Sequence, residues 1–439
     1  MGMDSTEIDT GAGYLGYREA FHLVCSSVPP MGTEELPLDS CVGRIVSEEL
    51  TAKISYPANA VSLKDGFAVR SEDVAAATPE RPVQLRVSGF VFAGSGSEGK
   101  VSPGYAVKIC SGGSIPPGSD AVVSDEFCME AMPGSVYIRA DAERGRNVLP
   151  AGGEIKAGAR IAARGEPIMP GCLGLAAAAG ISRVRVFRRP RAAVIGVGDE
   201  VVAPGCRLDQ GQLYASNIVT VGAWLTSFGV SHDSAIVKDD AEKIKRELAE
   251  CLPRVDVFLT SGGAWGSERD LVVNVLRGLG WQEIFHRVRM GPGKGIAFGL
   301  WEGKPVFCLP GGPASNEMAF LQLALPGILR MGGDNRHPLQ TVFARLAEDA
   351  KRRNQAWTEF KEVALFQDPQ GNYQSKPYEE KSRLQAIARA HGLVCIPEGV
   401  DSLKSGEIVP VQLLMPRLDG LEAGNDSLGQ ERPSPPRQP

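Results

Sequence analysis

The stretch from Arg191 to Leu329 alternates short apolar runs with segments of helical periodicity, and this pattern constrains the fold more than any other feature. The runs "RAAVIGVG", "VDVFLTSGG" and "KPVFCLPGG" have the apolar character of buried strands, and each reaches a glycine. Between them, "SNIVTVGAWLTSFG" is typical of a helix, with Ser216 at or near its N-cap and Gly229 as its stop. Strands that alternate with helices form a parallel sheet covered by helices on both faces. The sequence therefore predicts an α/β domain with a mostly parallel sheet over residues 191–335.

Hydrophobic periodicity and the spacing of Gly and Pro divide the remaining sequence into further regions. Short alternating runs separated by Gly and Pro, such as "VQLRVSGFVFAG" and "SVYIRA", predict a β-rich arm over residues 61–140. Residues 1–60 and 141–190 mix helical and extended patterns, with a helix expected in "YREAFHLVCSSV". Alternating runs over residues 336–416 indicate a small β-barrel or sandwich, and residues 417–439 have the polar composition of a disordered tail. The predicted fold class is a multidomain α/β plus β protein, because 439 residues exceed one ordinary core.

Composition narrows the class of protein. The chain carries 47 basic and 52 acidic residues, a net charge of −5 without long runs of one sign, which argues against nucleic-acid and membrane-surface binding. Its nine cysteines include no C-x-x-C pair, which argues against structural zinc and favours a reducing compartment. No apolar stretch reaches the roughly 18 residues of a membrane span, and the polar, acidic N-terminus is unlike a signal peptide. We therefore expect a cytoplasmic protein with neither a nucleic-acid nor a membrane partner.

Three of the predicted strands end in unusual sequence: "GVGDE", "TSGGAWGSERD" and "CLPGGPASNE". In an open parallel sheet, ligands bind beyond the carboxyl ends of the strands. Glycine lets the backbone approach a ligand closely, and N–H groups at the start of a following helix converge on anions. Each stretch taken alone is more typical of a simple tight turn, but three in one sheet favour a shared phosphate site. None matches the P-loop or the G-x-G-x-x-G pattern, so neither an ATPase nor a nicotinamide enzyme is supported.

Acidic residues beside these turns need an explanation, because carboxylates repel phosphate. If Glu200, Asp239 and Asp270 converge, a divalent cation with oxygen ligands, such as Mg²⁺, would neutralise the repulsion. The alternative is that Asp199, Asp239 and Asp240 simply cap helices or lie in solvent. In "MGPGKGIAFG", Lys294 adds a compact cation suited to phosphate, and the alternative for this stretch is a solvated hairpin turn.

Taken in order, these stretches resemble the motifs of the molybdopterin molybdenumtransferase family, the MoeA and gephyrin-type enzymes. "SLKDGFAVR" is similar to that family's S-A-M-D-G-Y-A-V-R, and "GVGDEVVAPG" is similar to T-G-D-E-L-x-x-P-G. "TSGGAWGSERD" looks like S-G-G-V-S-V-G-x-x-D, "MGPGKGIAFG" like M-K-P-G-K-P-x-A-F-G, and "GQLYASN" like G-Q-I-Y-D-S-N. The similarity extends from about Tyr17 to Met415. It implies an elongated homodimer with a mixed N-terminal region, a β-rich arm, a MogA-like molybdopterin-binding α/β domain and a C-terminal β-barrel-like domain.

The resemblance also implies an activity and a site. Family members insert molybdenum, from molybdate, into adenylylated molybdopterin and release AMP in a cation-dependent hydrolysis, between the α/β domain of one subunit and the arm of the other. Tungstate in place of molybdate stays open, and molybdopterin adenylyltransferase and apo-molybdoenzymes are the implied partners. The residues at matching positions are Asp65, Ser111 and Asp270 for catalysis; Ser261, Gly262, Gly263, Lys294, Pro310, Gly311, Pro313 and Ser315 for binding molybdopterin or its adenylylated form; and Glu200, Asp239 and Asp270 for Mg²⁺.

Several positions depart from the family pattern by gaining or losing a polar or charged group or by gaining bulk. Lys64, Ala215, Trp265, Gly291, Gly312 and Trp357 stand where the family has Met, Asp, Ser, Lys, Asn and Arg. A hydrogen bond to a charged group is typically worth about 1.5–3 kcal/mol, so lost cations weaken an anion site. Two other hypotheses therefore stay open beside metal insertion. One is a catalytically impaired molybdopterin carrier or a scaffold for a molybdoenzyme, and the other is hydrolysis of a different pyrophosphate-linked nucleotide.

Overall fold

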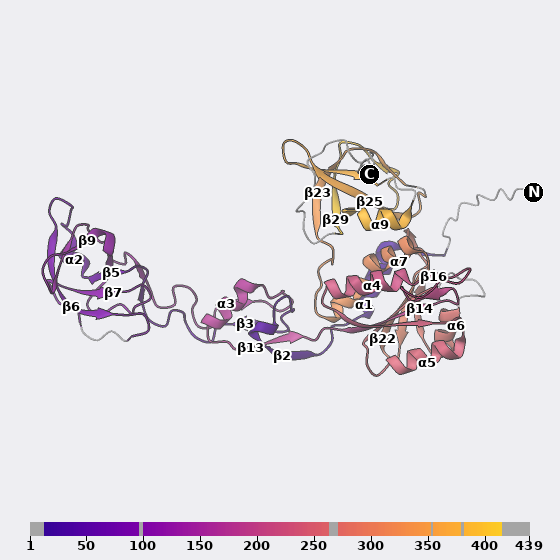
Figure 1. Ribbon diagram of the computed structural model, residues 1–439, viewed down its shortest axis with the longest axis horizontal. Helices are drawn as coiled ribbons and strands as arrows, with labels where there is room; N and C mark the ends of the chain where they lie inside the picture. Colours follow the sequence, from indigo (N-terminus) through magenta and orange to yellow (C-terminus); the bar gives the residue numbers. More distant parts are fainter. Residues whose placement is uncertain (1–12, 96–99, 263–270, 353, 379–381, 415–439) are drawn as a thin grey trace, which may run out of the picture. The chain divides into compact units, whose positions relative to one another are not determined.

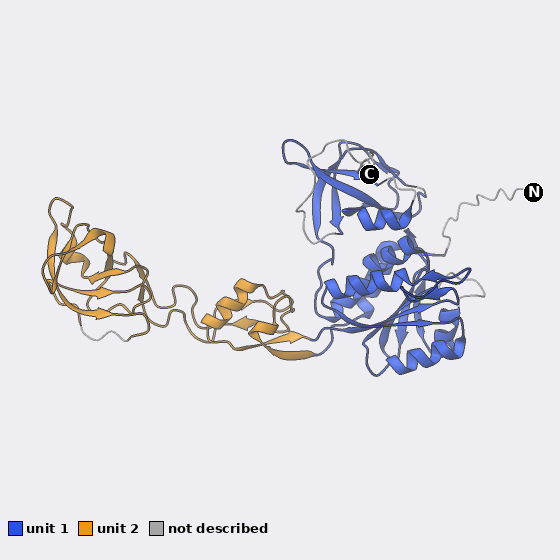
Figure 2. Cartoon of the chain, viewed as in Figure 1, with its two compact units in different colours: residues 1–32, 188–439 blue, residues 33–187 orange. Residues whose placement is uncertain are grey.

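The computed structural model describes residues 13–95, 100–262, 271–352, 354–378 and 382–414. The chain divides into two compact units, shown in different colours in Figure 2. Unit 1 comprises residues 1–32 and 188–439, and unit 2 comprises residues 33–187. In the described ranges, none of the helices combines the length and the apolar character that a membrane span requires. The predicted tail over residues 417–439 lies outside the described residues.

Unit 1 contains a six-stranded sheet in the order β17-β14-β18-β22-β21-β19 (Figure 1). The bounds are β17 Ser231–Val237, β14 Arg191–Val197, β18 Val257–Ser261, β22 Lys304–Leu309, β21 Ala297–Trp301 and β19 Gln282–His286. The first four strands are parallel, whereas β21 pairs antiparallel with both β22 and β19. The mostly parallel sheet that the alternating pattern predicts is therefore confirmed.

Helices cover both faces of this sheet, because successive side chains of a strand point to opposite sides. Leu259 packs with α1, α4 and the helices of residues 313–331, whereas Phe258 packs with α5 and α6. The bounds are α1 Tyr17–Ser27, α4 Ser216–Ser227, α5 Ala241–Cys251, α6 Leu271–Gly278, α7 Pro313–Ala319, η3 Phe320–Ala324 and α8 Leu325–Met331. As predicted, Ser216 is the first residue of α4, and Gly229 follows its end with a left-handed φ of +69°.

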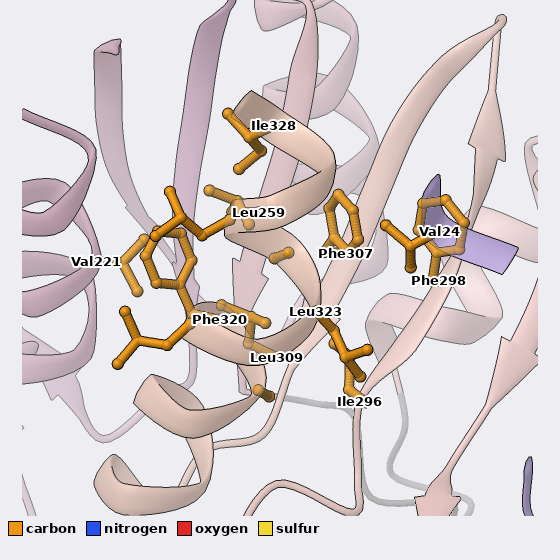
Figure 3. Close-up of a cluster of buried hydrophobic side chains, with 14 of the residues drawn as sticks. Val24, Val221, Leu259, Ile296, Phe298, Phe307, Leu309, Phe320, Leu323 and Ile328 are labelled. Carbon is orange, nitrogen blue, oxygen red and sulfur yellow. The ribbon is translucent and has the colours of Figure 1, made fainter. Parts of the chain in front are cut away.

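The largest apolar cluster of unit 1 lies between the sheet and α1, α4, η3 and α8 (Figure 3). The rings of Phe298 and Phe307 stack there with their centroids 4.6 Å apart. Val24 brings α1 into the same cluster. A Cβ added to Gly327 of α8 would lie 2.7 Å from the Cγ1 atom of Val24. The close contact between α1 and α8 therefore depends on glycine, and it makes the N-terminal helix part of the core of unit 1.

The C-terminal part of unit 1 is a barrel of β25, β26, β23, β29 and β27, closed because β27 pairs with both β29 and β25. This confirms the barrel among the two predicted alternatives. Two further strands, β1 and β20, extend the same sheet in parallel with β25. The bounds are β1 Leu15–Gly16, β20 Val288–Gly291, β23 Thr341–Leu346, β24 Ala350–Lys351, β25 Thr358–Gln367, β26 Tyr373–Pro377, α9 Arg383–Arg389, β27 Gly392–Ile396, β28 Ser402–Leu403 and β29 Ile408–Leu413.

The "MGPGKGIAFG" stretch connects the two sheets of unit 1. Its first residues belong to β20 in the barrel sheet, and its last residues belong to β21 in the α/β sheet. Gly293 and Ile296 between them are buried. A turn is present at residues 292–295, closed by the backbone hydrogen bond from Val288 N–H to the Lys294 carbonyl oxygen at 3.0 Å, but it is largely buried, so only the solvated part of the alternative is wrong.

Unit 2 contains a six-stranded sheet in the order β8-β5-β7-β6-β10-β9 and three two-stranded ladders. In each ladder the outgoing chain pairs antiparallel with the returning chain: β2 with β13, β3 with β12, and β4 with β11. The bounds are β2 Thr33–Pro37, η1 Leu38–Ser40, β3 Leu50–Thr51, β4 Val61–Ser62, β5 Gly66–Val69, α2 Ser71–Val74, β6 Val83–Val91, β7 Tyr105–Ile109, β8 Ala121–Ser124, η2 Asp125–Phe127, β9 Cys128–Glu130, β10 Ser135–Ile138, β11 Val148–Leu149, β12 Arg160–Ala162, α3 Pro170–Ala178 and β13 Arg183–Phe187. The β-rich arm therefore folds as one unit with residues 33–60 and 141–187 of the mixed segments, whereas residues 1–32 belong to unit 1, and the finer domain boundaries stay predictions.

Candidate functional site

A cavity of about 570 Å³ lies in unit 1, beyond the carboxyl ends of β14, β18 and β22. All three predicted glycine turns contribute to its wall. The predicted site residues among its lining are Glu200, Ser261, Gly262, Gly311 and Pro313. Three segments that are distant in the sequence therefore meet around one hollow at the sheet edge, where an open parallel sheet binds ligands.

Glycine is required where two of these turns approach each other. Gly262 has a left-handed φ of +99°, and a Cβ there would overlap the backbone carbonyl oxygen of Val197. A Cβ on Gly311 would lie 3.9 Å from the Cα atom of Gly262, so the second and third turns are neighbours. At the first turn, a Cβ on Gly198 would lie 2.7 Å from a carboxylate oxygen of Glu200. Small residues therefore keep the backbone accessible and leave room for the Glu200 side chain.

Two amide side chains hold these turns together around Ser261. The Ser261 hydroxyl oxygen accepts a hydrogen bond from Asn217 Nδ2 at 3.0 Å and another from Asn316 Nδ2 at 3.0 Å. The same amides also donate to the carbonyl oxygens of Gly311 and Pro310, both at 2.8 Å. Because a hydroxyl has two acceptor positions and one hydrogen, Ser261 keeps its O–H to donate to another group, and this residue lines the cavity. Ser261 therefore offers a fixed donor to a ligand oxygen.

Sequence reasoning missed Asn217 and Asn316 as functional residues. Both follow a strand-end turn closely: Asn217 is the second residue of α4, and Asn316 lies in the first half of α7. Asn316 is 1% exposed, which is unusual for a polar side chain unless its hydrogen bonds are satisfied. The signal available in the sequence was an amide at the start of a helix that follows a predicted site turn.

The remaining wall of the cavity is largely apolar. It includes Leu213 and Tyr214, which form β16 (Leu213–Tyr214) and pair with β15 (Val201–Val202), and it also includes Leu384 from α9. The Tyr214 hydroxyl donates to the carbonyl oxygen of Cys206 at 2.8 Å. Ala215, one of the departures from the family pattern, is buried in this wall and brings a methyl group where a carboxylate was expected. The cavity therefore combines a polar end at the glycine turns with an apolar side suited to a flat ring.

The predicted metal ligands are brought together only in part. Glu200 lines the cavity, whereas Asp239 follows β17 and pairs with Asp199, each backbone N–H donating to the other carboxylate at 3.3 Å. Asp240 caps α5 by accepting from two backbone N–H groups, as its alternative interpretation predicted. Asp270, Gly263 and Trp265 lie outside the described residues. Within the described ranges there is no group of three or more potential metal-binding side chains, so the assignment of Glu200, Asp239 and Asp270 to a metal stays a prediction.

Three other predicted residues, Lys294, Pro310 and Ser315, are not among the lining of the cavity. Lys294 places its ammonium group 5.5 Å from the centroid of the Trp357 ring, a cation–π distance. A Cβ on Gly291 would lie 3.8 Å from the same ring. Two departures that remove cations, Gly291 and Trp357, therefore lie side by side, and the buried indole occupies the space beside position 291.

In unit 2 the structure brings Asp65 and Ser111 together. The Ser111 backbone N–H donates to Asp65 Oδ1 at 2.7 Å, and both residues are exposed. The turn after β7 continues through Gly112, which has a left-handed φ of +77°. A Cβ on Gly66 would overlap the carbonyl oxygen of Val123 in β8, so the residue after Asp65 has to be glycine. Lys64, beside Asp65, is also exposed. The Asp65 carboxylate and the Ser111 hydroxyl are thus presented to solvent where the neighbouring strands β5 and β7 begin and end.

Comparison with known proteins agrees with this architecture along the chain. The model of the MoeA N-terminal region matches residues 15–180, that of the probable molybdopterin binding domain matches residues 193–330, and that of the MoeA C-terminal region matches residues 344–414. The chain is 30% identical over 380 residues to molybdopterin molybdenumtransferase 2 of Mycobacterium tuberculosis, covering 84% of this chain and 92% of that protein. It is 28% identical over 400 residues to molybdopterin molybdenumtransferase of Staphylococcus epidermidis, covering 91% and 95%.

A solved structure supports the same assignment. The molybdopterin biosynthesis MoeA protein of Pyrococcus horikoshii superposes with a TM-score of 0.76 at 32% identity, covering 91% of this chain and 99% of that chain. With 91% of the chain covered, the similarity includes residues of both units. The chain therefore belongs to the molybdopterin molybdenumtransferase (MoeA) family, transferases of molybdenum cofactor biosynthesis.

Proposed function

We propose that this transferase inserts molybdate, or tungstate, into adenylylated molybdopterin and releases AMP, with the phosphate end of the substrate held at the three glycine turns. The observation that carries the proposal is the Ser261 hydroxyl in the strand-end cavity, which accepts from two fixed amides and is left to donate. A donor fixed before the ligand arrives stabilises an oxyanion without reorganisation. A molybdopterin-related substrate follows from the family, whereas the roles of individual residues are proposals.

In unit 1, the proposed phosphate-binding groups are the Ser261 hydroxyl and the backbone around Gly262, Gly263 and Gly311. Asn217 and Asn316 act as positioning residues, because they hold Ser261 and the third turn in place. Pro310 and Pro313 shape the third turn, and Ser315 and Lys294 would contact the pterin side of the substrate. The Lys294 ammonium group supplies a positive charge on that side, while the neighbouring Trp357 presents an aromatic ring where the family has a second cationic side chain.

For Mg²⁺, the proposed ligands are the carboxylates of Glu200, Asp239 and Asp270. Magnesium in phosphate-transferring enzymes usually has one or two protein carboxylates and takes its other ligands from phosphate oxygens and water. The carboxylate of Glu200 at the cavity wall fits such a partial ligand set. When bound, the cation would offset the repulsion between carboxylates and phosphate and lower the pKa of a bound water.

In unit 2, we propose that Asp65 and Ser111 act on the reacting groups. The Ser111 N–H fixes one carboxylate oxygen of Asp65, which leaves the other free to take a proton from the attacking water. The Ser111 hydroxyl is a further donor for an oxyanion. By resemblance to the family, these residues would serve the α/β domain of a second subunit, so the active protein is proposed to be a homodimer. Molybdopterin adenylyltransferase as the donor of substrate, apo-molybdoenzymes as recipients, and a cytoplasmic location are part of the same proposal.

Reconstitution tests this function directly. Purified protein, adenylylated molybdopterin, Mg²⁺ and molybdate are expected to release AMP and to activate an apo-molybdoenzyme. Because general acid–base catalysis typically contributes about 10²–10⁴-fold, Asp65→Asn is expected to slow AMP release by at least about a hundredfold. Asp141→Asn is a matched control, since Asp141 is an exposed aspartate of the same unit.

Two outcomes would contradict parts of the proposal. AMP release that survives Asp270→Ala would refute the metal assignment. Binding of the substrate without molybdate-dependent AMP release would instead support the alternative of a carrier or scaffold.

A further inference from the structure

A second cavity, of about 490 Å³, lies in unit 1, and it shares no lining residue with the strand-end cavity. Its wall is formed by α4, α7, α9 and strands of the barrel. The polar and aromatic lining residues are Trp224, Glu317, Tyr378, Arg389 and His391. None of these residues has a role in the function proposed above.

Glu317 is the unusual member of this lining. Its side chain belongs to α7 and the residue is only 9% exposed. One carboxylate oxygen, Oε1, accepts a hydrogen bond from Trp224 Nε1 at 2.6 Å. Within the described part of the chain, Glu317 has no ion-pair partner, and its second oxygen accepts no hydrogen bond. This second oxygen is not among the fully buried polar atoms that lack a partner, so at the cavity wall it is accessible to a donor from a ligand.

Burial also changes the acidity of this group. It raises the pKa of Glu317 to about 7, and the nearby carboxyl of Glu362 on β25 raises it further, while the Trp224 hydrogen bond lowers it. The charged and titratable groups around it are Glu362 from β25, Tyr378 from the end of β26, and Arg389 and His391 from α9 and the residues after it. At a pH of about 8, Glu317 is mainly a carboxylate and can accept hydrogen bonds from a ligand.

The rest of the lining supplies donors and flat apolar surface. Tyr378, Arg389 and His391 all carry donor groups, and Ala364, Ile387 and Leu414 are apolar. The Nδ1 atom of His391 accepts from the backbone N–H of Leu365 at 2.9 Å, which orients the ring. The presence of Arg389 makes a simple cation an unsuitable ligand. An acceptor and several donors across apolar walls instead fit a neutral ring that has N–H groups next to a carbonyl.

We propose that this cavity binds a planar 2-amino-4-oxo-pyrimidine ring, the chemical class of pterins and guanine, with Glu317 accepting from the ring N–H and the amino group. A carboxylate matches two parallel N–H donors, and the donors of the lining match the ring carbonyl. The pterin of the substrate is the first source of such a ring, and in that respect the inference rests on the proposed function. A guanine compound is the second source.

The two cavities lie along the same helices, which links this ring site to the proposed phosphate site. Asn217 and Trp224 are both on α4, seven residues apart, which corresponds to roughly 10 Å along the helix axis. Asn316 and Glu317 are neighbours on α7. With the phosphate at Ser261, a pterin ring at Glu317 replaces the contacts of the pterin side with Lys294 and Ser315 proposed above, because neither residue lines this cavity.

Direct titration of the full-length protein tests the site. Free pterin and, separately, guanosine are added at a pH of about 8 to the wild type, to Glu317→Gln and to the control Glu362→Gln, with binding followed by calorimetry. Glu317→Gln is expected to weaken pterin binding by about tenfold, equivalent to about 1.4 kcal/mol, because the charged acceptor is lost. Glu362→Gln should bind pterin like the wild type, since Glu362 does not line the cavity. Stronger binding of pterin than of guanosine supports the substrate as the source, and equal binding rejects that source.

The pH dependence provides a second measurement. Wild-type affinity for pterin is expected to fall as the pH drops from about 8 to about 6, because Glu317 becomes protonated, and Glu317→Gln should lose this dependence. Trp224→Phe removes the hydrogen bond that lowers the pKa of Glu317, so it should move the midpoint to higher pH. This variant keeps an aromatic ring at position 224 and remains informative if Glu317→Gln fails to fold.

The possible failures can be told apart. If the wild type does not bind pterin, or if Glu317→Gln binds it equally well, the ring site is refuted even when AMP release is normal. If pterin binding depends on Glu317 but the wild type releases no AMP from adenylylated molybdopterin, the proposed function fails and the ring site stands.

Discussion

The candidate site residues of the two units are held in opposite ways. In unit 1, Ser261 and Asn316 are buried and fixed by side-chain hydrogen bonds between turns. In unit 2, Asp65 and Ser111 are exposed and joined by one backbone N–H to carboxylate bond. The first arrangement suits a binding surface that must have its shape before the ligand arrives. The second suits reactive groups, which need access to a substrate more than they need rigid packing.

The largest difference between the units is expected from substituting a turn glycine in each. In unit 1, Gly262→Ala meets both a left-handed φ, costing about 1–2 kcal/mol, and an overlap with the Val197 carbonyl oxygen, costing about 1–3 kcal/mol. We expect a loss of about 3 kcal/mol in the free energy of unfolding, measured by urea denaturation, together with loss of substrate binding.

The matched control in unit 2 is Gly112→Ala. Its φ is also left-handed, but the nearest neighbour of the added Cβ is the Ala93 Cβ at 3.5 Å. Only the backbone cost of about 1–2 kcal/mol is expected. Equal losses from the two substitutions would show that the close approach of the turns in unit 1 does not matter energetically.

The second prediction concerns the pH dependence of the stability of unit 1. The folded-state pKa of Glu317 is raised from 4.5 to about 7, so the folded protein binds more protons between these values than the unfolded chain does. Stability is therefore expected to fall as the pH rises through this window, by about 3 kcal/mol. Burial lowers the pKa of His337 below its ordinary value of 6.5. This second shift makes stability rise with pH at values below 6.5, which opposes the effect of Glu317. Comparing urea unfolding of the wild type and Glu317→Gln at pH values of about 5 and 8 isolates Glu317, and identical pH dependence in both proteins would contradict the prediction.

The third prediction compares the hydrogen bonds of the two regions. Asn316→Ala removes the side-chain donor to the Pro310 carbonyl and one of the two donors to the Ser261 hydroxyl, which keeps the one from Asn217, and it should lower the free energy of unfolding by about 1–2 kcal/mol. Ser111→Ala keeps the backbone N–H that binds Asp65, so its effect should stay below about 0.5 kcal/mol. Thermal and urea unfolding measure both effects. A large loss from Ser111→Ala would mean that its hydroxyl is structural, which would weaken its proposed role at the substrate.

The last prediction concerns Trp357 of unit 1, where packing and not hydrogen bonding holds the ring. Its indole N–H has no hydrogen-bond partner among the described residues, although the side chain is buried. Trp357→Phe keeps an aromatic face for Lys294 and should cost less than about 1.5 kcal/mol in unfolding free energy. A much larger loss, measured under the same denaturation conditions, would indicate a polar role for the indole.

The sequence predicted the parts of the fold that depend on local periodicity. The strands before the glycine turns, the helix that stops at Gly229 and the barrel strands after residue 340 all have patterns that are read within a few residues. The co-location of the three turns was also predictable, because parallel strands bring their carboxyl ends to one edge. The pairing of β20 with the barrel was not predicted, since it depends on contacts between residues 290 and 358 that no local pattern records.

Site residues were predictable from the sequence where the residue type alone is informative, such as a glycine in a turn or an exposed carboxylate. They were less predictable where the role depends on contacts made by a buried side chain. Gly262 and Asp65 stand out in the sequence by residue type. Asn316 does not, because an asparagine at a helix start is usually a solvent-exposed capping residue, and only the packing around it reveals that it holds Ser261. The same limit applies to Glu317, whose partner Trp224 lies on a helix far earlier in the chain and whose other cavity neighbours come from the barrel that follows it.

The insertion of unit 2 between α1 and β14 has a consequence for biosynthesis of the chain. Gly32 and Arg188 are joined by a backbone hydrogen bond of 2.9 Å, so the two crossings between the units lie next to each other. During translation, α1 emerges first, but the residues of η3 and α8 against which it packs are made only after all of unit 2. The apolar face of this amphipathic helix therefore lacks its native partners until residues 320–331 have been made, and exposed apolar surface of this kind favours aggregation.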